Sequence, residues 1–92
     1  MAQILLIMKI YPEGDKVDLD DLENNITNVL KSDMKLRKYE KLPLAFGINY
    51  LRCEFVIDEI DGALDELEKS INSITGVSQS EIINQSRLSV DI

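Results

Sequence analysis

Two stretches of the chain alternate apolar and polar side chains with the two-residue period of a β-strand. Residues 3–11 place an apolar side chain at every second position, and Leu5 and Ile7 fill two of the intervening positions. Both faces of this strand should therefore be partly covered, which favours a central place in a sheet. Residues 48–57 alternate more strictly and predict a half-buried strand, in which Cys53 is expected to be an inert core residue.

Two further strands are predicted from weaker patterns. Residues 34–42 alternate poorly, as expected of an exposed or bulged edge strand. Pro43 and Gly47 then interrupt the pattern, so residues 43–47 are predicted to connect this strand to the next. Residues 77–92 are polar and serine-rich but keep scattered aliphatic side chains, and they predict a last strand followed by a tail.

Apolar spacings of three and four positions mark two amphipathic helices. The first is predicted to follow an N-cap at Asp18, and the second an N-cap at Asp61. Gly76 lies where a C-cap glycine is expected after the second helix. The apolar stripe of the first helix consists of Leu19, Leu22, Ile26, Val29 and Leu30, and that of the second of Leu64, Leu67, Ile71 and Ile74.

The resulting order is strand, helix, strand, strand, helix, strand, which predicts the α+β class. Two right-handed strand–helix–strand units of this length form the split arrangement of the ferredoxin-like fold. We therefore expect one antiparallel four-stranded sheet, βαββαβ in order, with both helices on one face. A fold of this kind hosts many functions and does not identify one.

Length and composition indicate a single small domain over residues 1–92. A chain of 92 residues is well below the size at which proteins divide into two cores. Cys53 is the only cysteine, so no internal disulfide can form, and there is no histidine. Histidine is the commonest metal ligand and the usual catalytic base, so zinc sites and nucleophile–histidine pairs are excluded.

The charge of the chain is unevenly distributed. Seventeen acidic and ten basic residues give a net charge of -7, yet residues 31–41 hold five basic side chains and two acidic ones. This net +3 segment can steer an anionic partner toward the protein. Lysines on a solvated edge strand also prevent edge-to-edge pairing, and on charge alone that structural interpretation is favoured.

No targeting or membrane segment is predicted. The longest apolar run, residues 4–8, is far shorter than the roughly 20 residues that span a bilayer. The first residues lack the basic and small-residue pattern of a signal peptide. Together with the lone thiol, these observations favour the cytoplasm and argue against a membrane partner.

The sequence contains no motif for catalysis, for a cofactor or for a metal ion. The glycines at 14, 47, 62 and 76 are not spaced as a phosphate cradle. The strands that would form an RNA-binding face offer few aromatic side chains, and the acidic domain argues against direct nucleic-acid binding. Acidic pairs at 20–21, 58–59 and 65–66 are better explained by helix N-termini and solvated faces than by acid/base or magnesium chemistry.

Residues 42–48, which read Leu-Pro-Leu-Ala-Phe-Gly-Ile, resemble a segment of translation elongation factor 1-beta. The resemblance covers nearly the whole chain. It includes Pro12 after the opening strand, the aspartate-rich helix start around Asp18, the apolar strand through residues 55–57, and the sequence Gly-Val-Ser before the last strand. Its most specific element is Pro-x-x-Phe-Gly followed by a strand.

The resemblance is to the archaeal members, in which one such domain makes up the whole chain. It implies a guanine-nucleotide exchange factor for elongation factor 1-alpha, the GTPase that delivers aminoacyl-tRNA to the ribosome. Such a factor carries out no covalent chemistry, needs no cofactor and is expected to be monomeric when free. In eukaryotic relatives the last strand ends in Lys-Ile, and the lysine reaches the magnesium region of the GTPase. Ungapped counting from Val77 places this pair at Arg87 and Leu88.

The resemblance thus implies which residues contact the partner. Arg87 would oppose the magnesium ion, while Leu44, Phe46 and Leu88, with the adjoining Gly47, would press against a switch element. Phe46 can equally be a loop aromatic that folds back onto the core.

A function from another class stays open at this point. The same fold serves as a ligand-sensing or oligomerisation domain that works as a homodimer. Solution mass separates the two hypotheses, because an exchange factor is expected to be monomeric alone.

Overall fold

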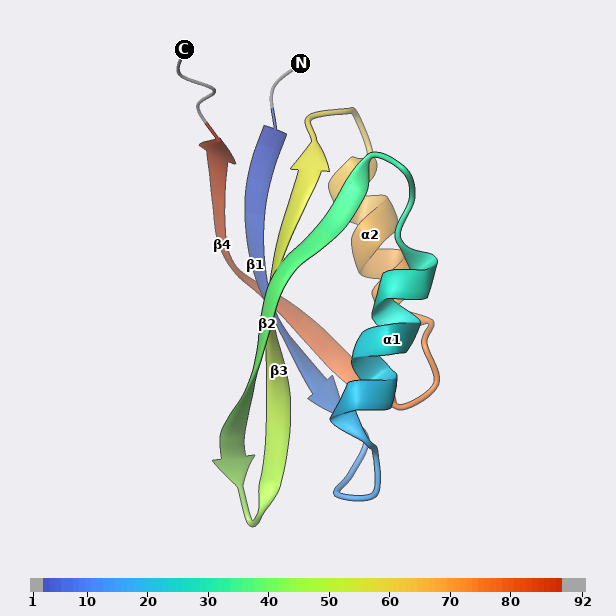
Figure 1. Ribbon diagram of the computed structural model, residues 1–92, viewed down its shortest axis with the longest axis vertical. Coiled ribbons are helices and arrows are strands. Elements are labelled where there is room, and N and C mark those ends of the chain that lie inside the picture. Colours follow the sequence, from blue (N-terminus) through green and yellow to red (C-terminus); the bar gives the residue numbers. More distant parts are fainter. Residues whose placement is uncertain (1–2, 89–92) are drawn as a thin grey trace.

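The computed structural model describes residues 3–88, which form a four-stranded antiparallel sheet and two helices. The strands lie in the order β2-β3-β1-β4, and both helices cover the same face (Figure 1). This confirms the predicted ferredoxin-like arrangement and the central place of the first strand. The elements are β1 (Gln3–Pro12), α1 (Leu19–Val29), β2 (Met34–Ala45), β3 (Ile48–Asp58), α2 (Ala63–Asn72) and β4 (Val77–Leu88).

The predicted connection over residues 43–47 is shorter in the structure. The edge strand β2 continues through Pro43 to Ala45, and Ala45 pairs with Ile48 of β3. Proline is tolerated here because an edge strand has a side on which no ladder hydrogen bond is needed. Only two residues are left for the turn, so the hairpin is tighter and longer than the pattern indicated.

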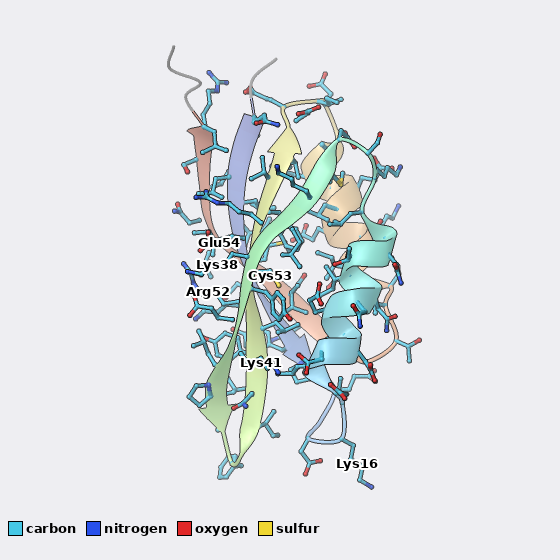
Figure 2. All side chains as sticks on the ribbon, in the orientation of Figure 1. Lys16, Lys38, Lys41, Arg52, Cys53 and Glu54 are labelled. Atoms are coloured by element: carbon cyan, nitrogen blue, oxygen red, sulfur yellow. The ribbon has the colours of Figure 1, made fainter. Side chains whose placement is uncertain are left out.

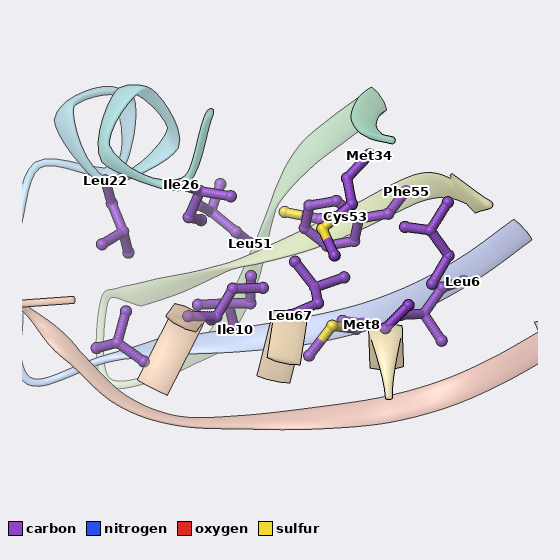
Figure 3. Close-up of a cluster of buried hydrophobic side chains, with 14 of the residues drawn as sticks. Leu6, Met8, Ile10, Leu22, Ile26, Met34, Leu51, Cys53, Phe55 and Leu67 are labelled. Carbon is purple, nitrogen blue, oxygen red and sulfur yellow. The ribbon is translucent and has the colours of Figure 1, made fainter. Parts of the chain in front are cut away.

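The core lies between the sheet and the helices (Figure 3). The alternation of β3 places Leu51, Phe55 and Ile57 in this core, where they are fully buried. Helix α1 contributes Leu22 and Ile26 from the predicted stripe. Among residues 3–88 no polar or charged side chain is buried, so folding of this part requires no costly desolvation of charge.

Helix α1 begins as predicted. The Asp18 side chain accepts hydrogen bonds from the backbone N–H groups of Asp20, at 2.9 Å, and Asp21, at 3.4 Å. These contacts satisfy two of the N–H groups that a helix start leaves unpaired. The acidic pair at 20–21 lies in the first turn of α1, where negative charge faces the positive end of the helix dipole, as expected.

Two of the predicted boundaries of α2 are wrong. The N-cap is Gly62, in a left-handed conformation with φ 82°, and not Asp61. The helix ends at Asn72 with Ser73 as C-cap, so Gly76 is not the C-cap. Gly76 has φ 102° and lies in the turn before β4, where a Cβ would lie 3.5 Å from Val17. Gly62 thus supplies its positive φ angle at the N-cap, and Gly76 supplies its positive φ angle in the turn before β4.

Cys53 is fully buried in the core, as predicted. Burial raises the pKa of its thiol to about 12, because the charged thiolate is poorly solvated there. We expect no reaction with Ellman's reagent at pH 8 in the native protein and full reaction in concentrated urea. Rapid labelling of the native protein would contradict the buried placement.

The same pKa shift predicts a pH dependence of stability. Above about pH 9, the ordinary value for this thiol, the unfolded chain loses a proton that the native state retains. The stabilising contribution is complete below this pH and decreases as the pH rises toward 12. The difference in unfolding free energy between the wild type and Cys53→Ala should therefore be constant below pH 9 and shrink above it.

Candidate functional site

The hairpin between β2 and β3 ends in a two-residue turn made by Phe46 and Gly47. Both residues have positive φ angles, 52° and 77°, which is the signature of a type I′ turn. Gly47 adopts this conformation without cost, whereas a bulky aromatic residue rarely does. Phe46 is the only non-glycine residue with positive φ among residues 3–88, and such local strain is commonly kept at functional sites.

The side chain of Phe46 is 100% exposed, and that of Leu44 is 49% exposed. Phe46 therefore does not fold back onto the core, which answers the question that the sequence left open. Leu44 is the extra residue of a bulge, because Pro43 pairs with Asn49 and Ala45 with Ile48. The hairpin tip thus presents two large apolar side chains to solvent.

Arg87 lies near the end of β4, opposite Ile4 of β1. Its Nη2 donates a hydrogen bond of 2.5 Å to Oε2 of Glu59, in the connection between β3 and α2. The Arg87 side chain remains 69% exposed. Leu88 follows opposite Gln3 and is half-buried. Ile4, Glu59 and Arg87 border a shallow hollow of about 340 Å³.

The structure does not bring all the predicted contact residues together. Leu44, Phe46 and Gly47 lie at one end of the sheet, while Arg87 and Leu88 lie at the other. The strand between these ends, β3, has 11 residues and spans about 36 Å at about 3.3 Å per residue. The molecule is correspondingly elongated, with extents of 45 × 21 × 17 Å.

The basic segment 31–41 is divided between structural and unpaired cations. Lys41 Nζ lies 2.8 Å from Asp20 Oδ1 and ties β2 to α1, and the hydrogen bond with Asp20 raises the pKa of Lys41. Lys31 forms an ion pair with Glu66 of α2. Lys35 and Arg37 form no ion pair within residues 3–88.

The face of the sheet away from the helices carries a network of opposite charges (Figure 2). Arg52 Nη1 lies 3.0 Å from Glu54 Oε2 and 3.6 Å from Glu40 Oε1. Lys38 Nζ lies 3.7 Å from the same oxygen of Glu40. Opposite-charge neighbours across antiparallel strands stabilise the pairing of those strands. This network and the Glu59 partner of Arg87 were not foreseen from the sequence, because both depend on register.

The remaining acidic pairs lie at structural positions. The Asp58 carboxylate accepts a hydrogen bond of 3.2 Å from Gln3, and Asp65 and Glu66 occupy the first turn of α2. Negative charge in a first turn is favourable because it faces the positive end of the helix dipole. Within residues 3–88, no helix is long and apolar enough to cross a membrane.

Comparison with known proteins identifies the family of the chain. Residues 5–88 match the family described as the EF-1 guanine nucleotide exchange domain. The chain belongs to this family. It is 36% identical over 89 residues to elongation factor 1-beta of Saccharolobus islandicus, strain L.S.2.15, covering 96% of the chain and 98% of the relative. The same protein of Hyperthermus butylicus is 34% identical over 90 residues, covering 97% and 98%.

Family membership settles the choice between the two functions expected from the sequence. The exchange domain promotes guanine-nucleotide exchange in translation, and the ligand-sensing or oligomerisation alternative is set aside.

Proposed function

We propose that this exchange domain accelerates GDP release from elongation factor 1-alpha by contacting the GTPase with both ends of its sheet. The observation that supports this most directly is the fully exposed Phe46 in a strained turn at one end. Exposed Arg87 supplies a cation at the other end. The two contacts are about 36 Å apart, so they address different parts of the GTPase.

The division of labour follows from the chemistry of the two ends. The apolar tip, Leu44 and Phe46, provides binding energy through burial of apolar surface. Arg87 provides positive charge, which opposes a magnesium ion and weakens its hold on the nucleotide phosphates. A partner that binds the nucleotide-free GTPase more tightly than the loaded form must weaken nucleotide binding by the same factor.

Glu59 acts as a resting partner for Arg87 in this proposal. The pair lies at the surface, with the two side chains 69% and 37% exposed. Exposed ion pairs of this kind contribute only about 0–1 kcal/mol, so the guanidinium can leave Glu59 for a stronger site at little cost. Leu88 and Gly47 support their neighbours: Leu88 anchors the strand end beside Arg87, and Gly47 allows the tight turn that displays Phe46.

Residues 1–92 act as a single exchange domain, as supported by the one hydrophobic core that all four strands and both helices share. The domain is monomeric when free and performs no covalent chemistry. It contacts the GTPase and not nucleic acid, in line with its net charge of -7. It acts in the cytoplasm, where elongation takes place.

Release of a fluorescent GDP analogue from purified elongation factor 1-alpha tests the proposal. The rate is measured at fixed Mg²⁺ with excess unlabelled nucleotide, with and without the exchange domain. We expect faster release at substoichiometric amounts, because one exchange domain then serves many GTPase molecules. Unchanged release from the cognate GTPase would contradict the proposal.

Arg87→Ala is expected to slow exchange about tenfold, which corresponds to a loss of about 1.4 kcal/mol, while the fold stays intact because the side chain is exposed. The effect should shrink when EDTA removes the magnesium ion, since there is then no ion to displace. Arg87→Lys keeps the charge and should retain most of the activity. Glu59→Gln serves as the matched control, because it frees Arg87 and should leave exchange as fast or faster. Equal slowing with and without Mg²⁺ would exclude the metal-opposing role.

A further inference from the structure

A groove runs between α1 and the edge strand β2. It is not part of either of the two proposed contact regions at the ends of the sheet. It measures about 550 Å³ and is lined by six consecutive residues of β2, from Met34 to Tyr39. The wall on α1 consists of Glu23 and Thr27, with Leu30 directly after the helix. Successive side chains of a strand point to opposite faces. A hollow touched by six residues in a row therefore follows the free edge of the strand, where backbone groups are unpaired.

The two sides of this edge differ in chemistry. Leu36 and Tyr39 pair with Phe55 and Cys53, which face the core, so they lie on the helix side of the edge. Lys35 and Lys38 pair with Val56 and Glu54 and lie on the open side of the sheet. Along the groove, the helix side thus offers apolar side chains, and the open side offers the cations of Lys35 and Lys38.

Two of the three cations that line the groove are available to a ligand, whereas the third, Lys38, lies 3.7 Å from Glu40. Neither Lys35 nor Arg37 forms an ion pair within the part of the chain that the structure describes. Arg37 is the extra residue of a bulge, because Leu36 and Lys38 pair with consecutive residues of β3. The one anion in the lining, Glu23, accepts a hydrogen bond of 2.8 Å from the Thr27 hydroxyl.

We propose that this groove binds an extended acidic peptide segment of another protein, which adds to β2 as a fifth strand. Its acidic side chains would alternate with apolar ones. The acidic set meets Lys35 and Lys38 on the open side, and the apolar set lies on Leu36 and Tyr39 beneath α1. Addition of a strand to a sheet edge supplies backbone hydrogen bonds, and alternate side chains supply specificity.

Other occupants fit the groove less well. A second copy of this chain would place the same cations opposite each other, and like charges directly opposite destabilise strand pairing. The bulge at Arg37 also disturbs the flat register that two identical edges need. A nucleic acid would meet Glu23 on the helix side of the groove and a domain with a net charge of -7. An alternating peptide places its acidic side chains on the side of Lys35 and its apolar ones on the helix side.

Amide chemical shifts of the ¹⁵N-labelled full chain test the proposal with synthetic peptides. The probe is a seven-residue peptide that alternates glutamate and valine. A second peptide has the same composition but groups its glutamates together, a third carries lysine for glutamate, and a fourth probe is a single-stranded RNA oligonucleotide. We expect the first alone to shift the amides of residues 34–39 and of the facing part of α1, with an affinity that falls as salt is added.

Charge reversal adds a matched comparison. The double variant Lys35→Glu, Arg37→Glu should weaken binding of the alternating peptide at least tenfold. Lys16→Glu reverses one charge in the exposed connection between β1 and α1, away from the groove (Figure 2), and should leave binding unchanged, whereas Lys35→Glu alone, with the same change in net charge, should weaken it. Equal binding of the grouped peptide, preferential binding of RNA, or shifts outside the groove would each overturn the proposal. None of these binding experiments depends on exchange activity, so the test is independent of the proposed function.

Discussion

Replacement of Phe46 by asparagine is expected to lower kcat/KM for nucleotide exchange about 30-fold without loss of stability. Loss of a central aromatic contact from an interface commonly costs about 2 kcal/mol or more, and each 1.4 kcal/mol is about tenfold. Phe46 contributes nothing to the core, because its side chain is 100% exposed. Asparagine followed by glycine is the preferred pair for a type I′ turn, so the hairpin should become as stable or more so.

This substitution therefore separates function from folding in one variant. Exchange is measured from release of a fluorescent GDP analogue, and stability from the thermal midpoint. Ile83→Asn is the matched control, because it removes another exposed aliphatic side chain, 41% exposed on β4, away from the tip. We expect normal exchange from this control. Wild-type exchange by Phe46→Asn would show that the strained turn serves no partner.

Phe55→Ala is expected to destabilise the fold by about 3–5 kcal/mol, the usual cost of deleting a buried phenylalanine. Phe55 is fully buried and is the largest side chain in the core. It lies on the helix-covered side of β3, so its loss leaves a cavity beneath the helices. Small domains are stable by only about 5–15 kcal/mol, so most of the stability margin is removed.

Urea unfolding followed by circular dichroism measures this loss. We expect a lower midpoint with an unchanged slope for Phe55→Ala, because the surface exposed on unfolding stays nearly the same. Phe55→Leu should lose less, since it keeps most of the apolar volume. The chain has only two phenylalanines, and Phe46→Ala is the natural control with no expected loss. A small effect of Phe55→Ala would mean that the core can collapse around the missing ring.

The fold was predictable because the local sequence patterns agree with the burial of side chains in the structure over most of the chain. The strict alternation of residues 48–57 fixed which face of β3 is buried, and Asp18 fixed the start of α1. The errors occurred where backbone conformation, not side-chain pattern, decides the boundary. Gly62 takes over the N-cap position from Asp61 through its left-handed conformation, and an edge position allows β2 to continue through Pro43.

The candidate site was predictable only in part. Phe46 and Arg87 emerged from a family resemblance, and no periodicity indicates either. The distance between them follows from the antiparallel order of the strands, and it cannot be read from the sequence alone. The Glu59 partner of Arg87 joins residues 28 positions apart, and the groove beside β2 depends on a bulge at one residue. Contacts of this kind exist only once the register is fixed.

The pairing of Gln3 with Leu88 has a consequence for how this domain can be combined with others. The first and last described residues are side by side, so the domain could be inserted into a larger protein without separating the two points of attachment. A protein segment fused before Gln3 or after Leu88 would begin at the end of the sheet that holds Arg87. A fused neighbour would therefore crowd the charged end while leaving the Phe46 tip, about 36 Å away, free to engage.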